Sequence, residues 1–196
     1  MKEEHKKGYI FLKTILKYPF KIWYNPKIIG KENIPTTGAI IICANHKHMM
    51  DQCPILISTK RMVHYLAKKE YFDGKFAWFF KMSGCISVNR SIKDTKASNK
   101  AIELLNQGHA IGLFPEGTRN RTKEKLLPFK YGAVSMAKKT NASIVPVGIS
   151  GDYKFRSKNL TIEFGKPYKL KSDDLEKENE LLYNTVKKML KNNNLV

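Results

Sequence analysis

Long apolar runs are missing from this sequence. None reaches the roughly 18 residues that mark a membrane-spanning helix, so no ordinary transmembrane segment is expected. The apolar stretch near the N-terminus is interrupted by three lysines, Lys13, Lys17 and Lys21. A signal peptide has an uninterrupted apolar core, so we expect no signal peptide here.

Cysteine is also scarce. The three cysteines, Cys43, Cys53 and Cys85, are an odd number at irregular spacing, which excludes a disulfide framework and favours a reducing compartment. Cys43 and Cys53 flank His46 and His48, so a zinc site is one interpretation of this region. The spacing lacks the paired short loops of structural zinc sites, and buried apolar cysteines beside a functional histidine are favoured instead.

Arginine is rare in a strongly basic chain. There are 31 lysines but only five arginines, and the net charge is +19. Such a charge attracts anionic partners, whether nucleic acid, anionic membranes or acidic proteins. Nucleic-acid-binding surfaces usually cluster their basic residues, whereas these lysines are spread along the whole chain. We therefore expect no nucleic-acid partner.

Apolar runs alternate with segments of helical spacing along the 196 residues, which suffice for one domain with a sizeable core. The expected strands are residues 39–44, 62–67, 85–88, 110–114, 143–149 and 160–164. The expected helices are residues 51–58, 75–82, 94–106, 131–139 and 175–191. This alternation predicts an α/β fold, a single domain with a mostly parallel or mixed central sheet flanked by helices. Sites in such folds lie in the loops beyond the strand ends.

The N-terminal segment has the pattern of an amphipathic helix over residues 8–24. Its three lysines recur every four residues and form one stripe, surrounded by aliphatic and aromatic side chains. Pro19 is expected to kink or split this helix. The composition favours a helix at a membrane surface, and the alternative is a helix packed on the core of the domain. We therefore divide the chain into a membrane-association segment, residues 1–27, and a main domain, residues 28–196.

A histidine and a carboxylate follow the first expected strand. His46 and Asp51 are five residues apart, and Asp51 would lie near the start of the next helix. A neutral imidazole can take a proton from a hydroxyl when its other nitrogen donates to a carboxylate. The pair is therefore a candidate general base with its orienting acid. Two alternatives remain: His48 is a rival base, and the histidine and aspartate can simply cap and charge the helix start.

A second candidate site is the turn at residues 114–119, which read Phe-Pro-Glu-Gly-Thr-Arg after an apolar run. Gly117 permits backbone angles closed to other residues, and the planar fork of Arg119 suits a phosphate. Glu116 can bind a substrate hydroxyl or hold an arginine, and the alternative is a solvated turn with a local Glu–Arg pair. A chain so poor in arginine is expected to use it where geometry matters.

Four segments in order closely resemble the four motifs of the glycerolipid acyltransferase family, in particular the 1-acyl-sn-glycerol-3-phosphate acyltransferases. They are residues 45–51, 84–90, 114–119 and 145–147. Further similarity occurs at residues 30–35, 69–72 and 128–133, so that the resemblance covers residues 28–168. His48 departs from the family pattern, because Ser or Thr often stands at that position.

The resemblance implies a reaction. His46, oriented by Asp51, would deprotonate the 2-hydroxyl of 1-acyl-sn-glycerol 3-phosphate (lysophosphatidate), which would attack the thioester of acyl-CoA or acyl carrier protein and give phosphatidate. Arg90 and Arg119 would hold the substrate phosphate. No metal or other cofactor is needed. The remaining substrate-binding residues of the third motif would be Glu116, Gly117 and Thr118.

The charge agrees with anionic lipid and acidic carrier protein as partners, and we expect a peripheral enzyme at the cytoplasmic face of the cell membrane. The aromatic residues Phe76, Trp78, Phe79 and Phe80 are expected to line an acyl groove, dip into the bilayer or pack in the core. Two other functions remain open: acyl transfer to a different lysolipid or phosphorylated alcohol, and non-catalytic binding of lipid or nucleic acid.

Overall fold

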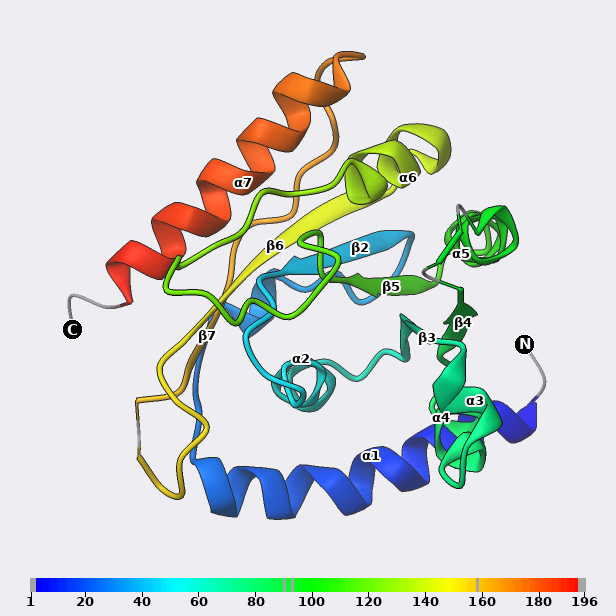
Figure 1. Cartoon of the computed structure of the whole chain (residues 1–196), viewed down its shortest axis with the longest axis vertical. Helices are drawn as coiled ribbons and strands as arrows, with labels where there is room; N and C mark the ends of the chain where they lie inside the picture. Colours follow the sequence, from blue (N-terminus) through cyan, green and yellow to red (C-terminus); the bar gives the residue numbers. More distant parts are fainter. Residues whose placement is uncertain (1–2, 90, 93, 158, 194–196) are drawn as a thin grey trace.

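The computed structural model describes residues 3–89, 91–92, 94–157 and 159–193. Within these residues, seven strands form one sheet in the order β1-β7-β6-β2-β5-β3-β4 (Figure 1). The strands are β1 (Lys27–Ile29), β2 (Ile40–Ala44), β3 (Val63–Lys68), β4 (Ile86–Val88), β5 (Ala110–Leu113), β6 (Ser143–Ser150) and β7 (Thr161–Phe164).

The sheet is mixed, as the sequence predicts. Strands β6, β2, β5, β3 and β4 run parallel to one another, β7 pairs antiparallel with β6, and β1 pairs parallel with β7. The carboxyl ends of the five parallel strands therefore meet at one edge of the sheet. In α/β sheets this edge is where ligands bind.

Helices cover both faces of the sheet (Figure 1). They are α1 (Glu3–Tyr24), α2 (Gln52–Ser58), α3 (Glu70–Asp73), α4 (Ala77–Met82), α5 (Thr95–Asn106), α6 (Gly132–Thr140) and α7 (Leu175–Asn192), with a 3-10 turn, η1 (Lys31–Asn33). Helices α5, α6 and α7 pack on one face. Helix α2 packs on the other, and α1 lies across α2 and α4.

Two apolar cores follow from this layering. Side chains of successive strand residues point to opposite faces. Thus Ile41 and Cys43 of β2 join the core beneath α5, α6 and α7, whereas Ile40 and Ile42 join the core beneath α1 and α2. All five residues of β2 are buried. The first candidate motif therefore leaves the most enclosed part of the sheet.

The expected strands and helices are present, with ends displaced by at most a few residues. Sequence reasoning missed β1, η1 and α3, which are only three or four residues long. β1 lies at the edge of the sheet and makes its backbone hydrogen bonds to β7, more than 130 residues away in sequence. Such short elements are specified by distant partners rather than by a periodic pattern of their own.

Helix α1 packs on the domain along one face and exposes the other, so the alternative of a helix packed on the core holds for its inner face. Its inner face packs on the domain through Tyr9, Leu12 and Phe20, each less than 8% exposed. Its outer face still carries a row of large apolar side chains, which we call the outer stripe: Phe11, Ile15, Tyr18 and Ile22.

Two residues of α1, Lys13 and Pro19, bear on how the helix packs and whether it is continuous. Lys13 does not face solvent fully, because its ammonium group donates to the main-chain oxygen of Thr59. Pro19 was expected to kink or split the helix; it lies inside one continuous helix, so the prediction of a split was wrong. The neighbouring Phe20 is buried against the core. Among the described helices, none combines the length with the apolar character that a membrane crossing demands.

Candidate active site

The two candidate motifs meet at the carboxyl edge of the sheet. The first, residues 45–51, connects β2 to α2, and the second, residues 114–119, follows the neighbouring strand β5. A hydrogen bond joins them: the main-chain N–H of His46 donates to Glu116 Oε1 at 2.6 Å. Seventy residues of sequence thus separate groups that share one site.

Asp51 organises the first motif. The residue is fully buried, and its Oδ2 lies 2.8 Å from His46 Nδ1. The same oxygen accepts the main-chain N–H groups of Lys47 at 2.7 Å and His48 at 2.8 Å. Its Oδ1 accepts the hydroxyl of Tyr153 at 2.8 Å. Asp51 stands at the start of α2, and its side chain makes no capping hydrogen bond to that helix.

The His46 ring is held in two directions. In the neutral ring, contact with a carboxylate keeps the proton on Nδ1 and leaves Nε2 as the proton acceptor. The imidazole also stacks on Phe114, with ring centroids 4.1 Å apart and planes inclined by 16°. Phe114 in turn stacks on Tyr65 at 5.8 Å. The His46 side chain remains 14% exposed, so a substrate hydroxyl can reach it.

His48, the rival base, has a different environment. Its Nδ1 accepts the main-chain N–H of Met50 at 3.3 Å, and its ring stacks on Tyr153 with centroids 4.4 Å apart. Among the described residues, no carboxylate contacts the His48 ring. Of the two histidines, His46 is therefore the one with an orienting acid.

Glu116 joins loops rather than facing solvent. The residue is 3% exposed, its Oε1 accepts His46 N–H, and its Oε2 accepts Leu127 N–H at 2.8 Å. Burial raises the pKa of this carboxyl group, and the two main-chain donors oppose that rise. Within the described part of the chain, Glu116 has no arginine partner. Both oxygens are occupied by main-chain groups, a positioning role that sequence reasoning had not assigned to it.

The rest of the second motif is open. Gly117 has a φ of 72°, and its N–H donates to Phe114 O at 2.9 Å, which closes the turn. Thr118 is exposed and Arg119 is half-buried. Among the described residues, neither side chain has a hydrogen-bond or ion-pair partner. Arg119 is thus available to an anion.

A lysine that sequence reasoning did not single out lies over this turn. A Cβ atom on Gly117 would stand 2.9 Å from Lys130 Nζ, so the ammonium group lies against the glycine. The main-chain N–H of Lys130 donates to Pro115 O at 2.9 Å, which ties the two segments together. With 31 lysines in the chain, only the fold distinguishes this one.

Arg90, the other arginine expected at the phosphate, lies outside the described residues. The strand before it in sequence, β4, ends at Val88 on the same sheet edge, three strands from β2. At about 4.8 Å per strand, that places the end of β4 about 14 Å from β2.

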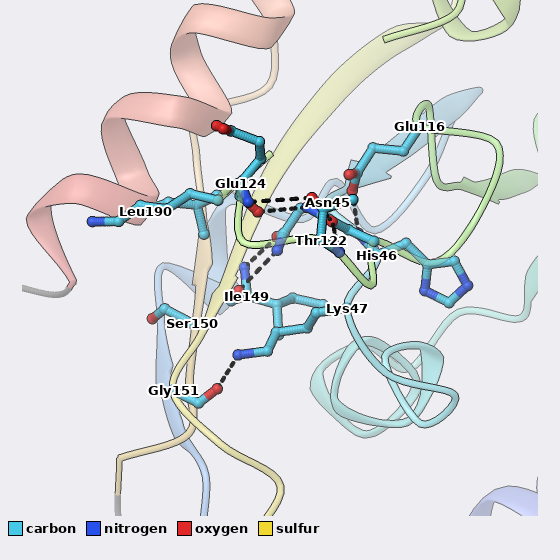
Figure 2. Close-up of a pocket in the computed structure, with 12 residues that line it drawn as sticks. Asn45, His46, Lys47, Glu116, Thr122, Glu124, Ile149, Ser150, Gly151 and Leu190 are labelled. Carbon is cyan, nitrogen blue, oxygen red and sulfur yellow. Dashed lines mark hydrogen bonds between the residues drawn. The ribbon is translucent and has the colours of Figure 1, made fainter. Parts of the chain in front are cut away.

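Two cavities flank the first motif. A polar one of about 290 Å³ lies beside the His46 main chain, and Figure 2 shows the imidazole directed away from it while Lys47 bonds to the main-chain oxygen of Gly151. An apolar one of about 250 Å³ lies between α1 and α2. It is lined by Leu16, Pro19, Phe20, Trp23, Tyr24, Met50 and Cys53.

The zinc interpretation finds no suitable set of ligands in the described residues, where no group of three His, Cys, Asp or Glu side chains is placed to hold a metal ion. Burial raises the pKa of the Cys53 thiol to about 12 and raises that of Cys43 further.

An oriented histidine beside an open, arginine-bearing turn is suited to acyl transfer to a hydroxyl on an anionic acceptor. The comparison with protein families agrees: residues 25–150 match the family described as "Acyltransferase". Fold and site thus define an acyltransferase.

Individual relatives narrow this class. The 1-acyl-sn-glycerol-3-phosphate acyltransferase of Borreliella burgdorferi is 36% identical over 148 residues, which are 70% of this chain and 56% of that protein. The enzyme of the same name from Bacillus subtilis is 30% identical over 165 residues, 81% of each chain. This chain belongs to the 1-acyl-sn-glycerol-3-phosphate acyltransferase family, which confirms the resemblance drawn from its four motifs.

A solved structure confirms the fold. The 1-acyl-sn-glycerophosphate (LPA) acyltransferase PlsC from Thermotoga maritima superposes with a TM-score of 0.77 at 23% identity, covering 98% of this chain and 83% of that one. The matched segment spans just over half the length of the Borreliella relative.

Proposed function

We propose that this protein transfers a fatty acyl group from an acyl-CoA or acyl carrier protein thioester to the sn-2 hydroxyl of 1-acyl-sn-glycerol 3-phosphate, giving phosphatidate. The observation that carries the proposal is the 2.8 Å contact between His46 Nδ1 and Asp51 Oδ2. This contact leaves Nε2 of His46 as the nitrogen that can accept a proton, on a side chain that is 14% exposed.

In the proposed reaction, His46 Nε2 takes the proton of the sn-2 hydroxyl as the oxygen attacks the thioester carbonyl carbon. The imidazolium that forms is stabilised by the buried Asp51 carboxylate. The tetrahedral intermediate then collapses, the C–S bond breaks, and the thiolate leaves. His46 returns its proton to that sulfur, so the products are phosphatidate and a free thiol. Neither a metal nor a covalent enzyme intermediate takes part.

The acceptor phosphate is proposed to bind at the second motif. Arg119 offers a bidentate fork, Gly117 lets the main chain approach closely, and Thr118 offers a hydroxyl. Lys130 adds a second positive charge over the same turn. Arg90 retains the phosphate-binding role that the family resemblance gives it, and Glu116 supports the site by holding the two motifs together.

The first experiment compares purified wild type with His46→Ala and His48→Ala on lysophosphatidate, with palmitoyl-CoA and palmitoyl-acyl carrier protein as parallel donors. General-base catalysis contributes about 100- to 10,000-fold, so His46→Ala should lose turnover on that scale while lysophosphatidate binding persists. His48→Ala should retain most of the activity. The donor that gives the faster turnover identifies the thioester that the enzyme uses.

Each contrary result has a distinct meaning. Loss in His48→Ala with full activity in His46→Ala would move the base to His48. No turnover by a folded wild type with either donor would reject this acceptor, and lysophosphatidylcholine and lysophosphatidylethanolamine would then be tested as acceptors. Lipid binding without transfer to any of them would favour a non-catalytic role.

We further propose that residues 1–27 attach the enzyme peripherally to an anionic membrane surface through α1. The four residues of the outer stripe recur at helical spacing and are between 51% and 68% exposed. Lys17 lies beside the stripe, with its ammonium nitrogen 5.5 Å from the centroid of the Tyr18 ring, and Lys21 lies in the last turn; lysines in such positions can reach lipid headgroups. The net charge of +19 favours the anionic lipids of a cytoplasmic leaflet.

Vesicle sedimentation tests this attachment. Phe11→Ser with Ile22→Ser should reduce pelleting with vesicles of phosphatidylcholine and phosphatidylglycerol, while turnover of a short-chain, water-soluble acceptor stays unchanged. The matched control is Leu181→Ser, which removes one exposed apolar side chain from α7. Equal pelleting of all three proteins would reject the outer stripe as the attachment surface.

A further inference from the structure

Tyr153 reaches the catalytic carboxylate from a distant part of the chain. It lies in the loop of residues 151–160 that connects β6 to β7, 102 residues beyond Asp51. Its hydroxyl donates to Asp51 Oδ1 at 2.8 Å. The three other donors to this carboxylate, from the first motif itself, all use Oδ2. Tyr153 is thus the partner of Asp51 Oδ1, the carboxylate oxygen that does not contact His46.

The Tyr153 ring is held between the catalytic turn and α1. On one side it stacks on His48, with centroids 4.4 Å apart and planes inclined by 20°. It also packs edge-to-face with two α1 aromatic rings, Tyr24 at 5.4 Å and Phe20 at 6.4 Å. A phenol packed among three rings has little freedom to turn its hydroxyl away from Asp51.

The same loop is joined to the end of α1 by two further contacts. The main-chain N–H of Arg156 donates to Trp23 O at 2.7 Å, and the ring of Phe155 packs edge-on against Trp23 at 4.8 Å. The contacts of Tyr153 are therefore part of a continuous connection between α1 and the dyad.

The hydroxyl is a donor over the whole working pH range. Burial raises the pKa of Tyr153 far above its usual value, and the nearby Asp51 carboxylate raises it further. The proton therefore stays on the phenol and is directed at Asp51 Oδ1. No proton transfer by Tyr153 is required.

We infer that Tyr153 is a positioning residue of the acyl-transfer reaction, whose hydroxyl sets the orientation of the Asp51 carboxylate so that Oδ2 faces His46 Nδ1. The inference rests on the proposed function. Without this hydroxyl, one oxygen of a fully buried carboxylate has no partner, and the carboxylate can turn to seek one. A shift of that kind weakens stabilisation of the imidazolium, which exists only in the transition state, and so lowers kcat.

Substrate binding should be spared. Among the described residues, the side-chain hydrogen bond and ring contacts of Tyr153 are with Asp51, His48, Phe20 and Tyr24, none of which is assigned to the acceptor phosphate. An effect through Asp51 alone therefore predicts a fall in kcat at nearly constant KM.

The test is Tyr153→Phe, which removes one oxygen and keeps the ring. We expect kcat to fall about 10- to 100-fold, the usual range for losing a hydrogen bond to a charged group, with KM for lysophosphatidate within about twofold. The matched control is Tyr168→Phe, which removes another buried tyrosine hydroxyl, one without a partner in the described structure. Its kcat should equal that of the wild type.

A double-mutant cycle separates positioning from general structural damage. In an Asp51→Asn background, Tyr153→Phe should cause little further loss, because the group through which it acts is already altered. Full additivity of the two losses would overturn the inference, and so would an unchanged kcat or an effect confined to KM.

A second measurement does not depend on turnover. The His46 Nδ1 proton, held by a carboxylate, should give a low-field proton resonance that is absent from His46→Ala. Tyr153→Phe should shift or broaden this signal, whereas Tyr168→Phe should leave it in place. An unchanged signal would overturn the positioning role even if the acyl acceptor proved to be another lipid. Failure of wild-type turnover, by contrast, would count against the proposed function alone.

Discussion

The two turns that carry the site leave neighbouring strands of one sheet, yet they differ in how completely they are formed. In the turn after β2, the Asp51 carboxylate is buried and accepts four donors. In the turn after β5, Thr118 is exposed and Arg119 is half-buried, and neither side chain has a partner within the described residues.

The difference separates a preorganised part of the site from a part that a ligand completes. Groups that stabilise a transition state act best when they need no rearrangement during the reaction. The Asp51 carboxylate, whose hydrogen-bond partners are already in place, fits this requirement. Arg119, which we propose binds the substrate phosphate, would have to remain free until the phosphate arrives. Glu116 lies in the second turn and links it to the first, because its Oε1 accepts His46 N–H, while its Oε2 accepts Leu127 N–H from the segment that follows.

The largest expected effect comes from Asp51→Asn. An amide at this position still fills the site but can no longer stabilise the imidazolium, and it can hold His46 in the wrong tautomer. By analogy with triad enzymes, kcat should fall by about four orders of magnitude while KM for lysophosphatidate changes little. Steady-state kinetics with either thioester donor would measure this. A loss expressed mainly in KM would show that the dyad binds substrate rather than activating it.

The dyad could be predicted because it is local. His46 and Asp51 lie five residues apart after a buried apolar strand, and the turn between them brings their side chains into contact. The partners of the dyad could not be predicted. Tyr153 and Glu116 reach it from 102 and 70 residues away, and neither stands in a pattern that indicates the contact.

The same distinction holds for the fold. The six strands expected from apolar runs are present, since burial on both faces leaves a sequence signal that does not depend on neighbours. The two interpretations of α1 could not be separated by pattern, because Tyr9 and Phe11 are equally apolar in sequence. Only packing shows that the first is buried and the second is 59% exposed.

Glu116→Ala tests whether the two turns depend on each other. It leaves the N–H groups of His46 and Leu127 without their acceptor, at about 1 to 3 kcal/mol for each group that stays buried. We expect the free energy of unfolding to fall by about 2 to 4 kcal/mol, and turnover to fall with it. Urea titration measures the first effect. The control is Glu124→Ala, an exposed carboxylate on the rim of the polar cavity, which should match the wild type. Equal stability of both variants would mean that Glu116 does not hold the turns together.

Arg119→Ala should act on binding instead of stability. Losing a charge-assisted contact to phosphate costs about 1.5 to 3 kcal/mol, so KM for lysophosphatidate should rise about 10- to 100-fold with a smaller change in kcat. Arg119→Lys should recover part of the loss, because it restores charge but not the bidentate fork. Arg121→Ala removes the same charge two residues away and serves as the control. If Arg121→Ala raised KM equally, the loss would come from the overall positive potential of the protein rather than from a direct contact with the phosphate.

The smallest effect concerns a histidine outside both turns. His64 of β3 is 3% exposed, its Nδ1 donates to Gly84 O at 2.8 Å, and its Nε2 is buried without a partner in the described structure. Burial lowers its pKa, and the nearby His109 lowers it further. A lowered pKa means that the folded state resists protonation. The stability that neutral His64 contributes is therefore complete above about pH 6.5, its ordinary value, and is lost as the pH falls toward the folded pKa.

His64→Gln, which cannot titrate, should therefore weaken the acid sensitivity of the fold and leave acyl transfer at neutral pH unchanged. Below pH 6.5 the unfolding free energy of the wild type should decline more steeply than that of the variant, by at most about 1.4 kcal/mol per pH unit. Urea midpoints measured from pH 7.5 down to about pH 5 supply the comparison. Parallel curves would show that protonation elsewhere governs acid unfolding, because one non-titrating side chain would then make no difference. A loss of turnover in this variant would show that the preorganised part of the site includes β3 as well as the two turns.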